Sequence, residues 1–517
     1  MLTLGELINR NARTHGDREA YVDMSRRVSW RALDERTDAL AHELRRSGVK
    51  PGDRIGVILK DCIEVVETIG ACAKVGAVRV GLNYRLAPPE LGALIDDSGI
   101  DQLFVQTEMA EIATSALQHS DRQPRLIGIG AGHSLERDYE TMIAKGATDT
   151  LFKQTRHERL MICYTTGSTG LPKGAIYPHQ LMMESMAAIA LAEGATPDDV
   201  FLHAMPASGV PIMHLMRNIF HGSKCAIIGE WDAERALQMI EAEQCSICVL
   251  VPTMLNSLLN SGLIEKYNVS SMRQLGYGSA PIPPATIRDA VQAFGCSFLQ
   301  MYGTTELMGM SMMMTATDHN LALNGGHDCL SSAGRPLYFV DVKIVDDAGN
   351  VLPDGEAGEL LIKTPYVIPG YWNQDVKYSE TVRDGWLYTG DIATRDSQGF
   401  IYLMDRAKFR IKSGGYNIFP VEIENCLAEH NAVDEVSVFG LPDPKWGDRI
   451  HATVTLSDGS DLTGEELREF CRGRIANFKI PKEIEIWDTL PKGPTGKIQK
   501  REIIEICKQR EAAPHSH

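Results

Sequence analysis

The sequence Tyr164-Thr-Thr-Gly-Ser-Thr-Gly-Leu-Pro-Lys-Gly174 follows directly after the apolar run Leu160-Met-Ile-Cys163. Its glycines allow backbone conformations in which N–H groups converge on an anion. Its hydroxyl side chains add hydrogen-bond donors, and Lys173 adds a mobile positive charge suited to phosphate oxygens. The stretch therefore predicts a phosphate-binding loop at the end of a strand. A surface turn rich in Gly, Ser and Thr is the alternative interpretation.

This loop does not match the P-loop of nucleotide triphosphatases. The P-loop pattern G-x-x-x-x-G-K-[ST] requires a Ser or Thr after the lysine as a Mg²⁺ ligand. Gly174 occupies that position here. A metal ion bound together with the phosphates would therefore need its ligand from another part of the chain.

Composition excludes several classes of protein. The chain has 517 residues, of which 44% are hydrophobic and 23% charged, which is typical of a globular protein with more than one domain. A net charge of −16 without a basic arm or stripe argues against nucleic-acid binding. No run of about eighteen apolar residues occurs, and the N-terminus lacks the features of a signal peptide. We therefore expect no integral membrane segment and a cytoplasmic location.

The cysteines agree with this location. There are eleven, without the spacing of a disulfide framework, which predicts reduced and mostly buried thiols. The one Cys-x-x-Cys, from Cys245 to Cys248, runs into an apolar segment and has no second pair beside it. We expect no metal site there.

Short strand-like runs alternate with helical patterns through most of the chain. This alternation predicts parallel sheets whose strands are joined by crossover helices. Expected strands cover residues 54–59, 102–106, 125–130, 224–228, 245–251 and 297–302, and expected helices cover residues 30–45, capped by Ser29, 63–75 and 108–118. Open sheets of this kind place their ligands at the carboxyl ends of the strands.

Two changes of texture divide the chain. After Gly326, turn-rich segments with strands at residues 340–345 and 358–363 predict a β-rich subdomain. Near Asp405 a basic cluster precedes Ser413-Gly-Gly415, and the last stretch of about 110 residues is long enough for a small domain. Within it we expect helices at residues 422–430 and 463–476 and strands at residues 435–439 and 451–456.

The predicted fold class is therefore α/β. We expect a large N-terminal domain of α/β layers with a β-rich subdomain, residues 1–404, and a small mobile α+β C-terminal domain, residues 405–517.

Three further motifs carry chemistry. Tyr302-Gly-Thr-Thr-Glu306 offers a ring for base stacking, hydroxyl donors and a carboxylate that could hold Mg²⁺. Tyr388-Thr-Gly-Asp391 places a carboxylate after a turn, as acidic residues that bind ribose hydroxyls are placed in other nucleotide sites. Pro491-Lys-Gly-Pro-Thr-Gly-Lys497 carries a lysine on a turn-rich segment. Taken singly, they are more typical of a core tyrosine, a turn aspartate and a solvated lysine, and together they favour a nucleotide site.

These motifs resemble, in the same order, those of the acyl-adenylate-forming superfamily, which includes acyl-CoA synthetases, firefly-type luciferases and peptide-synthetase adenylation domains. The resemblance runs essentially from end to end, through residues 164–174, 302–306, 388–391, 405–424 and 491–497. Residues 411–424 and 440–447 look like those of the CoA ligases. The resemblance implies a small-molecule carboxylic acid, ATP with Mg²⁺, and CoA as partners. The acid attacks the α-phosphate of ATP to give acyl-AMP and pyrophosphate, and the thiol of CoA then displaces AMP.

The resemblance also implies roles for individual residues. The expected catalytic residues are Lys497, Thr305 and Glu306, and Glu306 is also the expected Mg²⁺ ligand. The β- and γ-phosphates are expected to be bound by the loop residues Thr165, Thr166, Gly167, Ser168, Thr169, Gly170 and Lys173. The residues expected to bind the nucleoside and the acyl adenylate are Tyr302, Gly303, Thr304, Gly278, Ser279, Ala280, Asp391 and Arg406. Of these, Tyr302 stacks on the adenine, and Asp391 and Arg406 bind the ribose hydroxyls.

The second step implies a domain rotation. Lys497 would obstruct the approach of the thiol, and in the family the C-terminal domain turns about a hinge, which Asp405 matches. The loop that would replace the lysine carries Lys412, Gly414 and Gly415.

The acyl pocket departs from the family pattern. Ser208 and Gly209 stand where an aromatic residue and a histidine are common, so this wall of the pocket is expected to be small. Gly278, Met308 and Met310 are expected to line the rest, and methionines make an adaptable apolar surface. His214 either substitutes for the missing histidine or packs on a neighbour within a helix. We expect a medium to bulky hydrophobic or aromatic carboxylic acid.

The leading hypothesis is an AMP-forming acid:CoA ligase. An enzyme that passes the acyl group to a carrier protein or an amine is the alternative with the same fold. A nucleotide-binding sensor without catalysis is the alternative of another class. The sequence leaves the oligomeric state open, a homodimer included.

Overall fold

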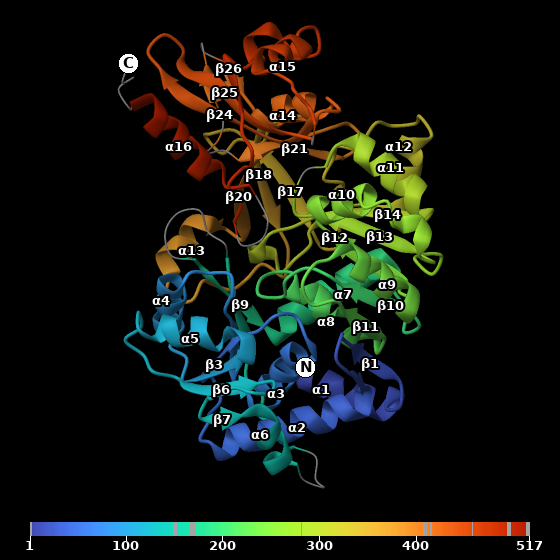
Figure 1. The fold of residues 1–517 in the computed structure, drawn as a ribbon, viewed down its shortest axis with the longest axis vertical. Coiled ribbons are helices and arrows are strands. Elements are labelled where there is room, and N and C mark those ends of the chain that lie inside the picture. The colour runs from blue at the N-terminus through green and yellow to red at the C-terminus, as the bar shows by residue number, and fades with distance from the viewer. Residues whose placement is uncertain are drawn as a thin grey trace.

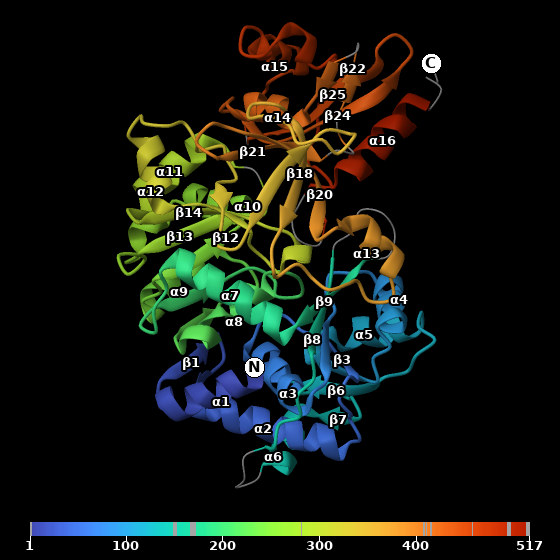
Figure 2. The same ribbon diagram turned by 180° about the vertical axis from the view of Figure 1, so that it is seen from behind.

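The computed structural model describes residues 3–147, 152–165, 172–280, 282–406, 409, 411–413, 416–457, 459–493 and 498–512. Its elements form a large α/β body with a β-rich sheet on it, and a small C-terminal domain at one end (Figure 1). The reverse view in Figure 2 shows the same order, with α1 and α2 at the end away from the C-terminal elements α14 to α16. The predicted fold class is confirmed.

One sheet of the body has seven strands in the order β7-β6-β5-β3-β4-β8-β9. It is parallel except for β9, which returns antiparallel to β8. Its strands are β3 (Arg54–Ile58), β4 (Val78–Gly81), β5 (Gln102–Gln106), β6 (Arg125–Ile129), β7 (Arg137–Asp138), β8 (Arg159–Tyr164) and β9 (Gly174–Pro178). The helices of this part of the chain are α1 (Leu4–His15), α2 (Trp30–Arg46), α3 (Ile63–Val75), α4 (Pro88–Ser98), η1 (Thr107–Met109), α5 (Ala110–Leu117) and α6 (Tyr139–Gly146).

The second sheet has nine strands in the order β16-β15-β14-β13-β12-β10-β11-β1-β2. Its strands are β1 (Glu19–Val22), β2 (Arg27–Ser29), β10 (Val200–His203), β11 (Lys224–Ile227), β12 (Ile247–Leu250), β13 (Gln274–Gly278), β14 (Ser297–Tyr302), β15 (Met312–Met314) and β16 (Arg335–Pro336). Its helices are α7 (His179–Glu193), α8 (Ile212–His221), α9 (Ala233–Glu243), α10 (Pro252–Asn260), η2 (Ile264–Lys266), α11 (Pro284–Phe294), η3 (Thr305–Leu307) and α12 (Ala316–Leu323). Strand β1 reaches this sheet from the N-terminus and pairs with β11.

The two sheets share a core. Cys163 of β8, Phe201 of β10 and Met216 of α8 belong to one cluster of buried side chains. Because burial of apolar area is the main favourable term in folding, this shared cluster joins the sheets into one body. The predicted alternation of strands and helices is confirmed, and α3 has the predicted ends because Gly76 terminates it in the left-handed conformation.

The β-rich subdomain is an antiparallel sheet with the order β17-β18-β20-β19, in which β21 also pairs with β20. Its elements are β17 (Asp341–Val345), β18 (Gly358–Lys363), α13 (Asp375–Thr381), β19 (Val382–Arg383), β20 (Trp386–Arg395) and β21 (Ile401–Arg406). The predicted boundary between residues 404 and 405 falls within β21.

The C-terminal domain has its own sheet and its own buried cluster. Its elements are β22 (Ile411–Ser413), β23 (Tyr416–Ile418), α14 (Pro420–Ala428), β24 (Val433–Asp443), β25 (Gly447–Leu456), α15 (Gly464–Cys471), η5 (Asn477–Lys479), β26 (Glu483–Ile486) and α16 (Lys500–Ala512). Three predicted ranges were wrong: the helix at residues 463–476 and the strands at residues 435–439 and 451–456. Helix α15 ends at Cys471 because Arg472 is extended, and the β24–β25 hairpin is longer because its pairing runs on to Asp443 and Gly447.

All eleven cysteines carry free thiols, nine of them buried. In the described ranges, none of the helices combines the length and apolar character that crossing a bilayer requires.

Candidate active site

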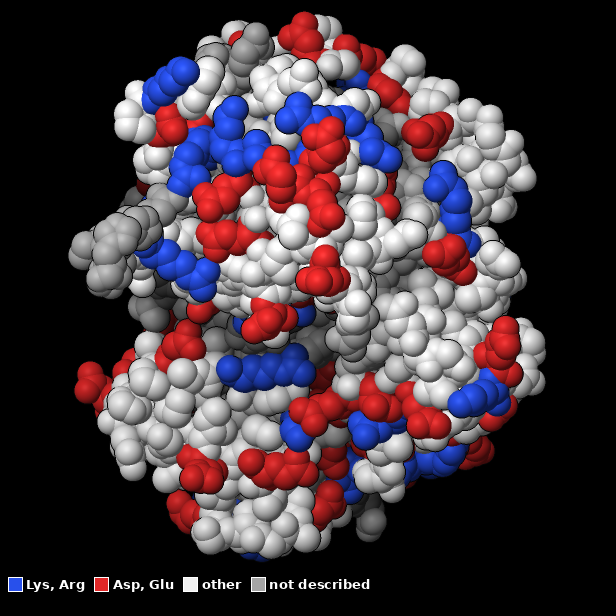
Figure 3. Space-filling view, turned by 45° about the horizontal axis from the view of Figure 1, so that its top comes forward, with Lys and Arg blue, Asp and Glu red and all other residues white. Residues whose placement is uncertain are grey.

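A cavity of about 1140 Å³ lies where strands of both body sheets end. Gly81 at the end of β4, Thr165 after β8, Gly278 at the end of β13 and Tyr302 at the end of β14 all line it. Carboxyl ends of parallel strands are the expected place for a ligand in such sheets. The space-filling view of Figure 3 shows basic and acidic side chains interspersed over one face, with a hollow across its middle.

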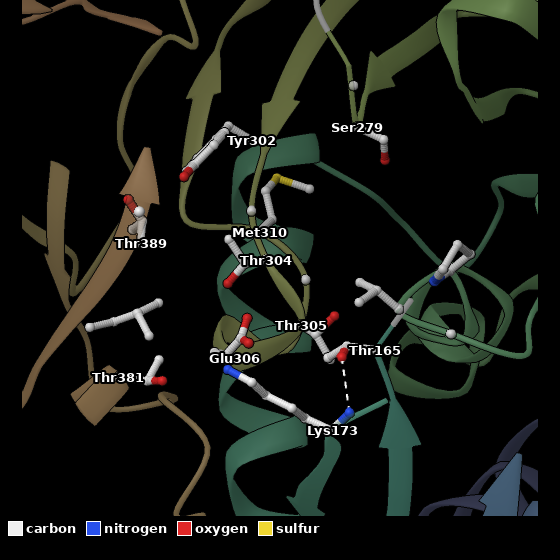
Figure 4. Close-up of a pocket in the computed structure, with 18 of the residues that line it drawn as sticks. Thr165, Lys173, Ser279, Tyr302, Thr304, Thr305, Glu306, Met310, Thr381 and Thr389 are labelled. Carbon is white, nitrogen blue, oxygen red and sulfur yellow. Dashed lines mark hydrogen bonds between the residues drawn. The ribbon is translucent and has the colours of Figure 1, made fainter. Parts of the chain in front are cut away.

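The phosphate-binding loop is closed at its base by a hairpin. Strands β8 and β9 pair up to Tyr164 and Gly174, and the Thr165 N–H donates to the carbonyl of Lys173 at 2.9 Å. The Lys173 N–H in turn donates to Thr165 Oγ1 at 3.2 Å (Figure 4). Thr165 and Lys173 therefore enter the cavity from fixed positions. Thr166, Gly167, Ser168, Thr169 and Gly170 lie outside the described residues.

A tyrosine connects this loop to the carboxylate predicted to bind the metal ion. The Tyr371 hydroxyl donates to Glu306 Oε1 at 2.6 Å, and Lys173 Nζ lies 4.8 Å from the centre of the Tyr371 ring. Burial raises the pKa of Tyr371, and the neighbouring Glu306 raises it further, so the phenol stays protonated and donates. In Figure 4 the end of Lys173 points toward Glu306. Sequence reasoning missed Tyr371, although the turn sequence Pro369-Gly-Tyr-Trp372 was a signal.

The segment after β14 presents its side chains through a tight turn. A Cβ on Gly303 would lie 1.5 Å from the carbonyl oxygen of Gly309, so this position requires glycine. Thr304 Oγ1 is buried and has no hydrogen-bond partner within the described part of the chain. The carbonyl of Thr305 accepts a hydrogen bond from Tyr177 at 2.9 Å. Residues 302–306 all line the cavity.

The residues predicted to bind the nucleoside converge from two sheets. The Tyr302 hydroxyl donates to Asp391 Oδ2 at 2.5 Å, and Asp391 is buried. Asp391 on β20 lies opposite Arg406 on β21, so the two residues predicted for the ribose are neighbours in the ladder. The side chain of Arg406 lies outside the described residues.

Backbone atoms form the wall at the end of β13. A Cβ on Gly278 would lie 2.2 Å from the carbonyl oxygen of Met301, so only glycine fits between β13 and β14. Ser279 follows with a left-handed backbone, φ +70°. Both residues line the cavity, whereas Ala280 is exposed and does not line it.

The predicted acyl pocket opens beside Ser208 and Gly209, which both line the cavity. A Cβ on Gly209 would meet only Pro211 Cδ within 4 Å, at 3.8 Å, so the space that a larger residue would fill is open. His214 of α8 also lines the cavity, and burial lowers its pKa well below the usual range, so it is neutral. The surrounding wall is apolar and comprises Ile189, Met205, Met213, Val249, Met254, Met301 and Met310.

Met308 does not join this wall. Its side chain is fully buried in the core that the two body sheets share. The chain passes through Met308 in a left-handed turn, φ +48°, and the Met308 carbonyl accepts from Ser185 Oγ at 3.1 Å. This turn directs the side chain into the core, whereas Met310 lines the cavity.

The C-terminal domain closes one side of the cavity through residues 498–501. Lys492 and Ile498 form an isolated bridge, and the Gln499 N–H donates to the Pro491 carbonyl at 2.8 Å. These contacts fix both ends of the segment that carries Lys497, which itself lies outside the described residues.

Of the residues predicted for the second step, Lys412 has a described side chain, and it lies outside the cavity. Lys412 is exposed on β22, its N–H donates to Asp448 Oδ2 at 3.0 Å, and it does not line the cavity. Gly414 and Gly415 lie outside the described residues. The backbone of Asp405 lies in β21 opposite Ile392, and its side chain is not described.

Several known proteins are similar to this chain in sequence and in fold. Residues 8–372 match the family model for the AMP-binding enzymes, and residues 422–497 match that for their C-terminal domain. A feruloyl-CoA synthase from Amycolatopsis sp. is 34% identical over 487 residues, which are 93% of each chain. A 2-succinylbenzoate–CoA ligase from Bacillus cereus is 31% identical, over 95% of this chain and 96% of its own.

An amide bond synthetase from Marinactinospora thermotolerans has a similar structure, with a TM-score of 0.89 and 26% identity over 98% of this chain and 99% of its own. These matches cover most of the chain, in both the N-terminal and the C-terminal part. The chain therefore belongs to the AMP-binding enzyme family, within the acyl-adenylate-forming superfamily that its motifs resemble.

Proposed function

We propose that this protein is an ATP-dependent, AMP-forming carboxylic acid:CoA ligase. The observation that carries the proposal is the convergence of Lys173, Glu306 and Tyr302 on one cavity that has an apolar wall on another side. Tyr371 and Asp391, which do not line the cavity, are hydrogen-bonded behind them to Glu306 and Tyr302. Relatives named feruloyl-CoA synthase and 2-succinylbenzoate–CoA ligase support the choice of reaction.

The nucleotide occupies the half of the cavity beside the β8–β9 hairpin. The charge of Lys173 and the donors of the loop from Thr165 to Gly170 hold the β- and γ-phosphates. The Thr304 hydroxyl, which has no hydrogen-bond partner among the described residues, supplies a further hydrogen bond. Tyr302 and Gly303 bind the adenine, together with the backbone of residues 278–280, and Asp391 with Arg406 binds the ribose hydroxyls.

Glu306 suits a magnesium ion. Its carboxylate is only partly buried and faces the cavity, and one of its oxygens already accepts the Tyr371 hydrogen bond. Mg²⁺ in nucleotide sites is commonly held by one or two carboxylates together with phosphate oxygens and water, which this arrangement allows. The ion would neutralise part of the phosphate charge. Thr305 lies next to it on the same turn and completes the catalytic group.

Adenylation joins two anions, so the site must supply positive charge. A carboxylate oxygen of the acid attacks the α-phosphorus, the bond to the bridging oxygen of pyrophosphate breaks, and pyrophosphate leaves with that electron pair. Lys497 stabilises the charge that develops between the carboxylate and the α-phosphate. The position of residues 498–501 in the cavity wall supports this role, because they follow Lys497 directly.

Thioester formation uses a different arrangement of the same chain. The CoA thiolate attacks the acyl carbon, and the bond from that carbon to the AMP oxygen breaks. The domain of residues 405–517 turns about Asp405, so that Lys412, Gly414 and Gly415 replace Lys497. The exposure of Lys412 outside the cavity is consistent with the arrangement that precedes this turn.

The acid is medium to bulky and hydrophobic or aromatic. Gly209 leaves the pocket open on one side, and methionines on the other side can adapt to different shapes. Ser208, His214 and Gly278 line the same cavity. The free thiols support the cytoplasmic location expected from the sequence.

Pyrophosphate exchange into ATP tests the proposal across a panel of carboxylic acids, followed by CoA addition. We expect acid-dependent exchange and a CoA thioester. The similar amide bond synthetase makes an amine acceptor the second candidate, and that enzyme would show exchange without a thioester. A nucleotide sensor would show no exchange, and the proposal would then be wrong.

A further inference from the structure

A charged side chain lies beneath the floor of the acyl pocket. Arg79 is on β4, between β3 and β8, and only 2% of its surface is exposed. Its neighbours in the ladder are Ile55 and Met161, which are buried apolar residues. A guanidinium in such surroundings costs stability unless it is paired and hydrogen-bonded.

Arg79 has no such partner among the residues that the structure describes. Its side chain makes neither a hydrogen bond nor an ion pair there, and its Nε is completely buried. Asp61 contributes a nearby negative charge, but its oxygens are used elsewhere. Asp61 Oδ2 lies 3.1 Å from His203 Nε2, and Asp61 Oδ1 accepts a hydrogen bond from the Ala207 N–H at 2.9 Å. Burial lowers the pKa of Arg79 to about 10, so the group is still a cation at neutral pH.

The guanidinium is aimed toward the cavity. Arg79 and Gly81 point to the same face of β4, because side chains alternate along a strand. A Cβ on Gly81 would lie 3.1 Å from Arg79 Nη1 and 3.5 Å from the carbonyl oxygen of Ser208. Gly81 and Ser208 both line the cavity. Because Gly81 has no side chain, Nη1 lies directly behind this part of the cavity wall, and Arg79 itself does not line the cavity.

A buried cation at the base of an otherwise apolar pocket selects for an anion at the far end of the ligand. We propose that Arg79 binds a second carboxylate on the acid, remote from the carboxylate that is adenylated. The substrate class is therefore a dicarboxylic acid with a hydrophobic or aromatic middle. This inference rests on the proposed function and narrows its substrate. A carboxylate accepts two hydrogen bonds from a guanidinium in a geometry that a lysine or a neutral donor does not match.

The test compares matched acids that differ only at the far end. Pyrophosphate exchange is measured with octanoate and octanedioate, and with hydrocinnamate and its para-hydroxy and para-carboxy derivatives. In the unmodified enzyme we expect kcat/KM for each diacid to exceed that of its monoacid by about tenfold or more, the scale of a hydrogen bond to a charged group. A preference for the para-hydroxy compound would assign Arg79 to a phenol and overturn the proposal.

Arg79→Met and Arg125→Met form the variant pair. Methionine fills a similar volume without charge, and we expect the ratio of diacid to monoacid kcat/KM to fall about 10- to 100-fold in Arg79→Met. Arg125 is exposed on β6 of the same sheet and does not line the cavity, so its variant should keep the ratio. A structural role alone would lower the melting temperature and leave the ratio unchanged.

The outcomes separate the two proposals. Equal or greater kcat/KM for the monoacids in the unmodified enzyme overturns the role of Arg79 and leaves the ligase function standing. That comparison needs no variant, so it decides the matter even if Arg79→Met does not fold. Exchange with none of the acids overturns both proposals.

Discussion

The contact between Tyr371 and Glu306 gives a sharp prediction, because one oxygen atom can be removed without changing shape. Tyr371→Phe deletes the hydroxyl that donates to Glu306 Oε1 at 2.6 Å. Tyr371 is only 1% exposed, so water cannot easily take the place of that donor. The carboxylate then loses the group that orients it toward the cavity.

The magnitude follows from the type of bond. A hydrogen bond to a charged group contributes about 1.5–3 kcal/mol, and about 1.4 kcal/mol corresponds to a factor of ten. We therefore expect kcat/KM for MgATP in adenylation to fall by about 10- to 100-fold. The ring that Lys173 Nζ covers is retained in phenylalanine, so the loss reports on the hydroxyl.

Pyrophosphate exchange at limiting MgATP measures this effect, with thermal unfolding as a check on the fold. Tyr267→Phe is the matched control, because the Tyr267 hydroxyl donates to Glu234 Oε1 at 2.7 Å and the residue does not line the cavity. The control should retain normal exchange. If folded Tyr371→Phe also exchanges normally at limiting MgATP, Glu306 does not need this partner and the reasoning is refuted.

Three further variants test other parts of the account. Lys497→Ala should lower adenylation by about 10² or more while thioester formation from supplied acyl-AMP survives, and equal losses in both half-reactions would contradict the two-conformation scheme. Asp405→Pro should spare adenylation and impair transfer to CoA because proline fixes φ; normal overall turnover would rule out the hinge. Gly209→Phe should place its ring in the open space beside Pro211 and lower kcat/KM for bulky acids about tenfold relative to short ones, and an unchanged ratio would show that the acid binds elsewhere.

Local patterns predicted the bounds of helices well where a capping residue marks the end of the helix. Ser29 caps α2 by accepting from the Ala32 N–H, and Gly76 ends α3. The division of the strands into two sheets was not predictable, because both sheets have the same alternation of strand and helix. The insertion of β1 beside β11 depends on contacts across two hundred residues of sequence, which no local pattern encodes.

The candidate site shows the same division. Motifs at strand ends placed Thr165, Lys173 and residues 302–306 in the cavity, because the topology of parallel sheets brings such ends together. Met308 was expected to line the cavity, but its side chain is buried in the core, because the backbone at Met308 is left-handed. Arg79 gave no signal in the sequence, where an arginine on an inner strand is indistinguishable from one at a sheet edge.

The most direct test of the proposed function is the set of products formed from ATP, CoA and the best acid of the panel. We predict AMP, pyrophosphate and an acyl-CoA thioester in equal amounts, with no nucleotide turnover when the acid is omitted. Formation of ADP and phosphate, or AMP release that does not depend on a carboxylic acid, would contradict the account.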